Sequence, residues 1–290
     1  MASKSENLNR FLRKGRTLIV PIDHGNAIPV PGLESPAKVI ESLNRYADGY
    51  VVNYGVASRY QRALGGKGVC LRTDVYKPAE KGQPDDGSFR IYDATDAGKL
   101  GANAMMNMAY PNHPNERGML EDCTTLVRSG RAEGIPLIVE TLPYGLGQTK
   151  YYTAENIGFA ARQAAELGAD VVKTAFPTGA SVEDFAKVVE ACFVPVIILG
   201  GAAMGDDKAL LKMVADAMEA GAIGVAIGRN IWQHENPTGI ARAMAAVIHE
   251  GETVAEALKL VSAPPESDDH ENEVEIEKEE APDELAPSSD

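Results

Sequence analysis

The chain has 290 residues, of which 44% are hydrophobic, and its formal net charge at pH 7 is −14. This length suits one (β/α)₈ barrel or two smaller domains, and the hydrophobic fraction is ordinary for a protein with a full core. No apolar run reaches the roughly 20 residues of a membrane-spanning helix. Residues 1–16 are polar and charged, unlike a secretory signal, which favours a cytoplasmic protein.

Most of the negative charge lies at the C-terminal end. Residues 266–290 hold twelve acidic side chains and one lysine, so the rest of the chain is nearly neutral. We predict a folded domain in residues 1–262 and a disordered acidic tail in residues 263–290, because the tail has too little apolar surface to form a core. The tail could bind a basic partner or only promote solubility. The nearly neutral domain has no basic face for nucleic acid, and we predict neither a nucleic-acid nor a membrane partner.

The three cysteines, Cys70, Cys123 and Cys192, stand in apolar contexts without paired spacing. This pattern predicts reduced thiols rather than a disulfide framework. The histidines also lack the spacing of metal ligands. We therefore expect no metal and no other cofactor.

From residue 17 onward, short apolar segments alternate with longer amphipathic ones. The predicted strands are 17–22, 49–53, 68–71, 103–108, 136–141, 170–174, 195–199 and 224–227. The predicted helices between them are 36–46, 115–133, 154–167, 182–191 and 206–220. Gly168 and Gly221 follow two of these helices, where a left-handed residue commonly ends a helix.

The strands are apolar on both faces, as parallel strands covered by helices are. Eight such units predict an α/β fold with a single closed (β/α)₈ barrel. The third unit is irregular, because residues 72–96 are rich in glycine, proline and aspartate. We expect a long loop there, passing over the mouth of the barrel.

Lys173 ends the sixth predicted strand, in a sequence that is otherwise nearly all apolar. Chemistry in a (β/α)₈ barrel takes place at this carboxyl end of the strands. Burial disfavours the charged form of an amine, and a neutral amine can attack a carbonyl to form a Schiff base. The alternative is a structural ion pair with a nearby carboxylate.

Four further polar residues end predicted strands. Asp23 could be a general acid/base beside the lysine or a hydrogen-bond acceptor for loop amides, and His24 could orient the site or only pack. Glu140 could carry a proton or be the counter-ion of the lysine. Asn53 could hold a substrate hydroxyl or close the barrel rim.

Glycine-rich turns follow the seventh and eighth strands. Gly200 and Gly201 lie in the first turn and Gly228 in the second, and a short helix is expected to begin near Arg229. Exposed backbone N–H groups and one guanidinium suit a phosphate group, and this is where barrels commonly bind phosphate. We predict a phosphate site there.

Together, the stretches Asp23-His24-Gly25, Lys173-Thr174, Gly200-Gly201 and Gly228-Arg229-Asn230 resemble the archaeal-type class I aldolase family. That family includes fructose-bisphosphate aldolases, aminodideoxyheptulosonate synthases and autoinducer thiolases, and the similarity runs from about residue 16 to residue 260. It implies a (β/α)₈ barrel with a metal-independent Schiff base on Lys173. It also implies Asp23 as an acid/base residue, Gly201, Gly228 and Arg229 as phosphate ligands, and a homo-oligomer of five or ten barrels.

One departure from the family concerns the proton-transfer residue. Many members carry Tyr-Pro-Arg-Gly after the fifth strand, with the tyrosine as proton donor or acceptor, but residues 142–145 here read Leu-Pro-Tyr-Gly. Either Tyr144 acts from the shifted position, or Glu140, Tyr151 or Tyr152 replaces it.

We therefore predict a cytoplasmic lyase of carbohydrate metabolism, a class I aldolase that cleaves or forms a C–C bond in a phosphorylated ketose. The catalytic residues would be Lys173, Asp23 and Tyr144. One alternative is a transaldolase-like synthase or an acyl-transferring thiolase of the same family. The other is a barrel that binds a phosphorylated metabolite without catalysis.

Overall fold

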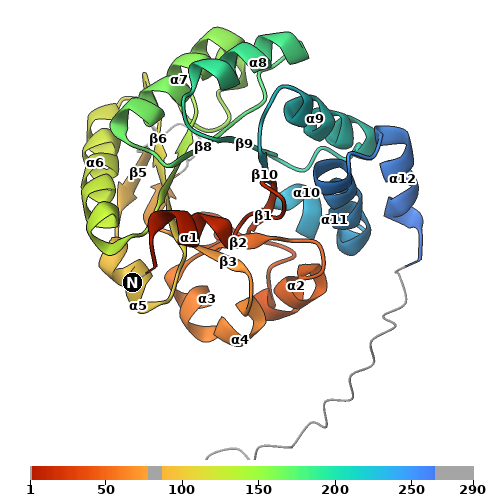
Figure 1. Cartoon of the computed structure of the whole chain (residues 1–290), viewed down its shortest axis with the longest axis horizontal. Coiled ribbons are helices and arrows are strands. Elements are labelled where there is room, and N and C mark those ends of the chain that lie inside the picture. Colours follow the sequence, from red (N-terminus) through yellow and green to blue (C-terminus); the bar gives the residue numbers. More distant parts are fainter. Residues whose placement is uncertain (1, 78–86, 265–290) are drawn as a thin grey trace, which may run out of the picture.

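The computed structural model describes residues 2–77 and 87–264, and it confirms the predicted barrel. Eight parallel strands close on themselves when β10 pairs with β1, and helices surround them (Figure 1). The barrel strands, in spatial order, are β1 (Thr17–Pro21), β2 (Gly49–Val52), β3 (Gly68–Arg72), β6 (Ala104–Ala109), β7 (Leu137–Thr141), β8 (Val171–Thr174), β9 (Val196–Leu199) and β10 (Gly224–Ala226). Each of them overlaps a predicted strand.

The predicted helices are also present, and α7 and α8 have the predicted bounds. In the described residues the helices are α1 (Lys4–Asn9), α2 (Pro36–Leu43), α3 (Tyr54–Arg59), α4 (Gln61–Leu64), α5 (Ala94–Lys99), α6 (Glu116–Glu133), α7 (Ala154–Leu167), α8 (Val182–Ala191), α9 (Asp207–Glu219), α10 (Arg229–Trp232), α11 (Pro237–Ala245) and α12 (Val254–Ser262), with short turns η1 (His24–Asn26), η2 (Thr149–Tyr151) and η3 (Ala246–Glu250). Gly168 and Gly221 adopt the predicted left-handed conformation, at φ 104° and 101°.

The predicted loop over residues 72–96 is wrong at both ends. Residue 72 is the last of β3, and the chain then forms an antiparallel hairpin of β4 (Asp74–Lys77) and β5 (Gly87–Arg90). Asp74 in β4 and Ser88 in β5 are buried, whereas Lys77 and Phe89 are exposed. Because the buried side chains Asp74 and Ser88 are polar, the sequence lacks the alternation of apolar and polar residues that marks a strand. Residues 78–86 lie outside the described residues.

The amino-terminal segment closes the floor of the barrel. In Figure 1, α1 lies across the end of the ring of strands, and Lys4 Nζ is 2.7 Å from Asp170 Oδ2. Phe11 follows α1 and packs into the inner layer of the barrel. A Cβ atom on Gly49 or Gly68 would overlap the Phe11 ring, which explains why these strands begin with glycine.

Side chains that point into the barrel change from apolar to polar toward the mouth. Val51, Cys70, Ile138 and Val171 belong to the inner apolar cluster. Since side chains alternate along a strand, the residues two positions farther on also point inward. These residues are Asn53, Arg72, Glu140 and Lys173.

The three cysteines are free and buried, as predicted. No helix among the described residues is both long and apolar enough to cross a membrane. The last helix of the described residues, α12, ends at Ser262, and the predicted boundary between the domain and the tail stays a prediction. Of the predicted disordered tail, residues 263–290, residues 265–290 lie outside the described residues.

Candidate active site

Lys173 lies inside the barrel mouth and is paired with Glu140. The two residues are neighbours in the register of β7 and β8, and Lys173 Nζ is 3.0 Å from Glu140 Oε1. Lys173 is only 4% exposed, and its amine also lies 4.0 Å from the sulfur of Met106. Burial raises the pKa of Glu140, but Lys173 and Arg72 outweigh this effect, so the pKa lies below its usual value. Glu140 is therefore a carboxylate near neutral pH.

Arg72 is a central residue of the site that the sequence did not reveal. It is 4% exposed and donates hydrogen bonds from Nε to Asp23 Oδ2 at 2.6 Å and from Nη2 to Glu140 Oε2 at 2.7 Å. Its Nη1 lies 3.4 Å from Asp74 Oδ1. The apolar run predicts a strand that ends at residue 71, and Arg72 lies one residue beyond it. One more residue of strand would have placed it inward, two positions after Cys70.

The predicted acid/base residue Asp23 belongs to the same network. Burial raises the pKa of its carboxyl, but Arg72, His24 and Lys173 together lower it to about 2. Asp74 differs, because burial raises its pKa and Arg72 only partly offsets that effect. Asp23, Arg72, Glu140 and Lys173 thus form one continuous chain of hydrogen bonds and ion pairs across the mouth.

His24 and Asn53 surround Asp23. His24 Nδ1 is 3.5 Å from Asp23 Oδ1, and its ring meets Trp232 edge-on. Burial and neighbouring cations lower the pKa of His24 in spite of Asp23, so the imidazole is mainly neutral at pH 7 and the contact is not an ion pair. Asn53 Nδ2 donates to the backbone oxygen of Asp23 at 2.7 Å. Asn53 therefore holds the backbone of Asp23, whereas His24 Nδ1 has no hydrogen-bond partner among the described residues.

The two glycine-rich turns are held together by Asn230. Its Nδ2 donates to the backbone oxygens of Gly200 at 3.0 Å and Ala202 at 3.1 Å, and its Oδ1 accepts from the backbone N–H of Met204 at 2.8 Å. Asn230 follows Gly228 by two residues, so it ties the turn after β10 to the turn after β9. The structure therefore brings together the two segments that we predicted to bind phosphate.

Arg229 and the glycines offer polar groups at this edge of the mouth. Arg229 is half-buried, and among the described residues its Nε has no hydrogen-bond partner. Burial lowers the pKa of its guanidinium. Gly201 has a φ of 66°, which favours glycine, whereas Gly228 is required for space. The arrangement suits an anion that would pair with Arg229.

The tyrosines of the loop after β7 contact other residues of that loop. Leu142 is buried in the hydrophobic core. Tyr144 has a φ of 63° and stacks on Tyr151, with ring centroids 3.9 Å apart. Tyr152 donates its hydroxyl to the backbone oxygen of Gly145 at 2.7 Å, and burial raises its pKa to about 12. Within the described chain no hydrogen bond joins Tyr144 to the network, and its catalytic role stays a prediction.

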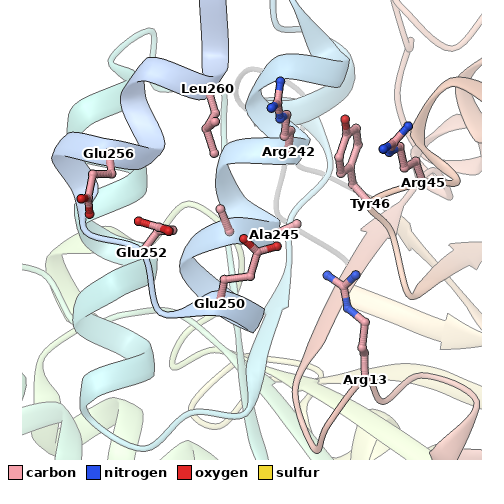
Figure 2. Close-up of a pocket in the computed structure, with 10 residues that line it drawn as sticks. Arg13, Arg45, Tyr46, Arg242, Ala245, Glu250, Glu252, Glu256 and Leu260 are labelled. Carbon is pink, nitrogen blue, oxygen red and sulfur yellow. The ribbon is translucent and has the colours of Figure 1, made fainter. Parts of the chain in front are cut away.

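A separate cavity of about 430 Å³ lies on the opposite side of the barrel from this site. Arg13 and Tyr46, which precede β1 and β2, belong to its lining, so it opens near the amino ends of the strands. In Figure 2 the arginines and Tyr46 face glutamates across the cavity.

The described residues contain no group of three or more side chains arranged to hold a metal ion.

Comparison with known proteins identifies relatives that share most of the chain. Residues 17–234 match the DeoC/LacD family of aldolases. The chain is 33% identical over 250 residues to 2-amino-3,7-dideoxy-D-threo-hept-6-ulosonate synthase 1 of Archaeoglobus fulgidus, covering 86% of this chain and 92% of that protein. It is 32% identical over 268 residues to the class 1 fructose-bisphosphate aldolase of Thermoproteus tenax, covering 90% and 100%.

Solved structures agree with these relatives. An archaeal fructose-1,6-bisphosphate aldolase, with its catalytic lysine covalently bound to the carbinolamine intermediate of the substrate, superimposes with a TM-score of 0.73. It has 27% sequence identity, and the match covers 85% of this chain and 99% of that one. A Schiff-base-forming fructose-1,6-bisphosphate aldolase gives a TM-score of 0.74 at 27% identity, covering 85% and 100%.

Proposed function

Since the chain belongs to the DeoC/LacD family of aldolases and is a class I, Schiff-base-forming enzyme, we propose that Lys173 is its Schiff-base residue and a phosphorylated ketose its substrate. The placement of Lys173 carries this proposal. Its amine is buried at the carboxyl end of a barrel strand, where a carboxylate lies 3.0 Å away to accept its proton. The similarity to fructose-bisphosphate aldolases supports fructose 1,6-bisphosphate as the first substrate to test.

We assign the proton transfers of Schiff-base formation to Glu140, whose Oε1 lies 3.0 Å from the Lys173 amine. The Lys173 ammonium passes a proton to Glu140 Oε1, and the neutral amine attacks the ketone carbon. The new C–N bond forms as the carbonyl π pair moves to oxygen, and a proton passes from nitrogen to that oxygen. Glu140 then returns its proton to the carbinolamine hydroxyl, which leaves as water. The product is a protonated iminium, and Glu140 is again a carboxylate.

Asp23 serves the carbon–carbon step. The iminium draws in the electron pair of the neighbouring C–C bond, which breaks to give an enamine, and the departing carbon becomes an aldehyde as its hydroxyl loses a proton. Asp23, ionised at neutral pH, is the base for that proton, with Tyr144 as the candidate relay from the loop. The enamine then takes up a proton at carbon, and water releases the ketone from Lys173.

The glycine turns and Arg229 fix the substrate for these steps. We assign the phosphate to Gly200, Gly201, Gly228 and Arg229, because the first two lie after β9 and the others after β10. Strand β9 is the direct neighbour of β8, which carries Lys173. A phosphate anchored there would hold the ketone carbon against the amine, which raises the effective concentration of the reacting groups.

Borohydride trapping tests the assignment of Lys173. Treatment with dihydroxyacetone phosphate and borohydride should give a stable adduct on the peptide that contains Lys173, and Lys173→Met should abolish the adduct while inorganic phosphate still binds. Lys4→Met is the matched control, because Lys4 also pairs with a carboxylate but lies at the barrel floor. An adduct on another lysine, or one that persists in Lys173→Met, would contradict the proposal.

Transaldol chemistry is a second candidate, supported by the similarity to the Archaeoglobus synthase. Position 142, where many family members carry the proton-transferring tyrosine, holds a leucine in this chain. This difference is compatible with a different acceptor substrate. Product analysis separates the two activities. Aldol cleavage releases dihydroxyacetone phosphate and glyceraldehyde 3-phosphate from fructose 1,6-bisphosphate alone. A synthase needs a second carbonyl compound, and a thiolase needs coenzyme A.

We also propose that the protein is cytoplasmic and forms a homo-oligomer of five or ten barrels, as the family resemblance implies. Analytical ultracentrifugation tests the assembly, and a sedimenting mass equal to one 30.9 kDa chain would contradict it.

A further inference from the structure

We propose that Arg72 is a positioning residue that holds Asp23 and Glu140 in fixed orientations, so that each carboxylate keeps one oxygen for chemistry. The proposal rests on the function proposed above. Arg72 itself would not touch substrate, since it is 4% exposed and each terminal arm of its guanidinium already faces a carboxylate.

The hydrogen bonds divide the carboxylate oxygens between two tasks. Arg72 Nη2 binds Oε2 of Glu140, and Lys173 contacts the other oxygen, Oε1. Arg72 Nε binds Oδ2 of Asp23, whose Oδ1 faces His24 at 3.5 Å. Because a guanidinium is planar and rigid, these two bonds fix the carboxylates relative to each other.

The hairpin after β3 holds the arginine in place. Asp74, the first residue of β4, lies 3.4 Å from Arg72 Nη1 and accepts a hydrogen bond from the backbone N–H of Met108 at 2.9 Å. Asp74 is 1% exposed. The third arm of the guanidinium is thus tied to the neighbouring strand β6, so Arg72 cannot turn toward a substrate without losing this contact.

Arg72 also prevents the two carboxylates from competing for one proton. Two buried carboxylates near each other do not readily ionise together. The cations that face Asp23 are Arg72 and Lys173, and the His24 ring beside it is mainly neutral at pH 7. Glu140 faces the cations Lys173 and Arg72 and the carboxylate of Asp23. With a neutral side chain at position 72, burial and mutual repulsion would raise the pKa of at least one carboxyl. The acid limb of the pH–rate profile, where activity falls because a carboxylate takes up a proton, would then move to higher pH.

The test compares Arg72→Gln with Arg72→Lys in the full-length enzyme, measuring cleavage of fructose 1,6-bisphosphate and borohydride trapping against pH. For Arg72→Gln we expect kcat to fall roughly 100-fold or more, KM to change less than about threefold, and the acid limb to shift upward by at least one pH unit. For Arg72→Lys the acid limb should stay near its wild-type position while kcat falls about tenfold, because a point charge cannot hold two carboxylates in one plane. His249→Gln is the control, because it removes a buried contact to Asp48 at the barrel floor and should change neither quantity.

A purely structural role gives a different result. Arg72→Gln would then unfold at lower urea concentration, but its folded fraction would keep the wild-type kcat and pH profile, and the proposal would be wrong. If Arg72→Gln does not fold, wild-type kcat in Arg72→Lys overturns the proposal equally well. Absence of trapping in the wild-type enzyme would instead refute the Schiff-base function, so the two failures are distinguishable.

Discussion

Gly228→Ala tests whether the turn after β10 binds phosphate. Gly228 has a φ of −107°, outside the left-handed region, so the prediction rests on the space available for a Cβ atom. A Cβ atom would lie 2.5 Å from the backbone oxygen of Pro21 and 2.9 Å from Trp232 Nε1. These two atoms are themselves joined by a 3.0 Å hydrogen bond, so neither can move away without breaking it.

The substitution should therefore displace the turn and Arg229 with it. Overpacking of this kind costs about 1–3 kcal/mol of folding free energy. A charge-assisted hydrogen bond contributes about 1.5–3 kcal/mol, and its loss would raise KM for fructose 1,6-bisphosphate roughly 10- to 100-fold. The inhibition constant of inorganic phosphate should rise in parallel, while kcat falls less.

Initial-rate kinetics with phosphate as competitive inhibitor, together with urea unfolding, measure both effects. Gly55→Ala is the matched control, because its Cβ would meet no atom within 4 Å. If Gly228→Ala lowers stability as expected but leaves KM and phosphate inhibition within twofold of wild type, phosphate does not bind at this turn and the reasoning fails.

Two further substitutions or treatments probe the core and the thiols. Phe11→Ala should lower the free energy of unfolding by about 3–5 kcal/mol, because Phe11 is buried on the barrel floor. Its kcat should be unchanged at 25 °C, and a melting temperature equal to wild type would show that the segment after α1 is not docked. Burial raises the pKa of the Cys123 thiol to about 12 and raises those of the other two, so the native protein should not react with Ellman's reagent. Three thiols per chain should react in guanidinium chloride, and fast labelling of the native protein would refute the burial.

The alternation of strands and helices made the barrel and the position of Lys173 predictable. Each barrel strand is a short apolar run, and parallel strands leave their carboxyl ends at one rim. That rule alone placed Asp23, Glu140 and Lys173 at the mouth, and the structure joins them in one network. The pairing of Glu140 with Lys173 needed the strand register, which the sequence pattern does not specify.

Arg72 and Tyr144 show where the sequence is insufficient. Arg72 lies one residue past an apolar run. The end of an element is uncertain by about one or two residues, so the sequence does not show whether Arg72 belongs to the strand. Tyr144 depends on a left-handed backbone turn and on stacking with Tyr151, both of which arise from loop geometry. The sequence shows Asn230 only as part of a family motif. Its hydrogen bonds to the turn after β9 depend on the distance between the two turns, which the sequence does not reveal.

Closure of the barrel by β1 and β10 constrains how the chain can fold during translation. Thr17 pairs with Gly224, so more than 200 residues separate the two edges that must meet. Until β10 has left the ribosome, the nascent chain exposes the unpaired edge of β1. This edge can pair with the strands of other chains. Truncation before residue 224 is therefore expected to produce aggregation rather than a smaller stable domain.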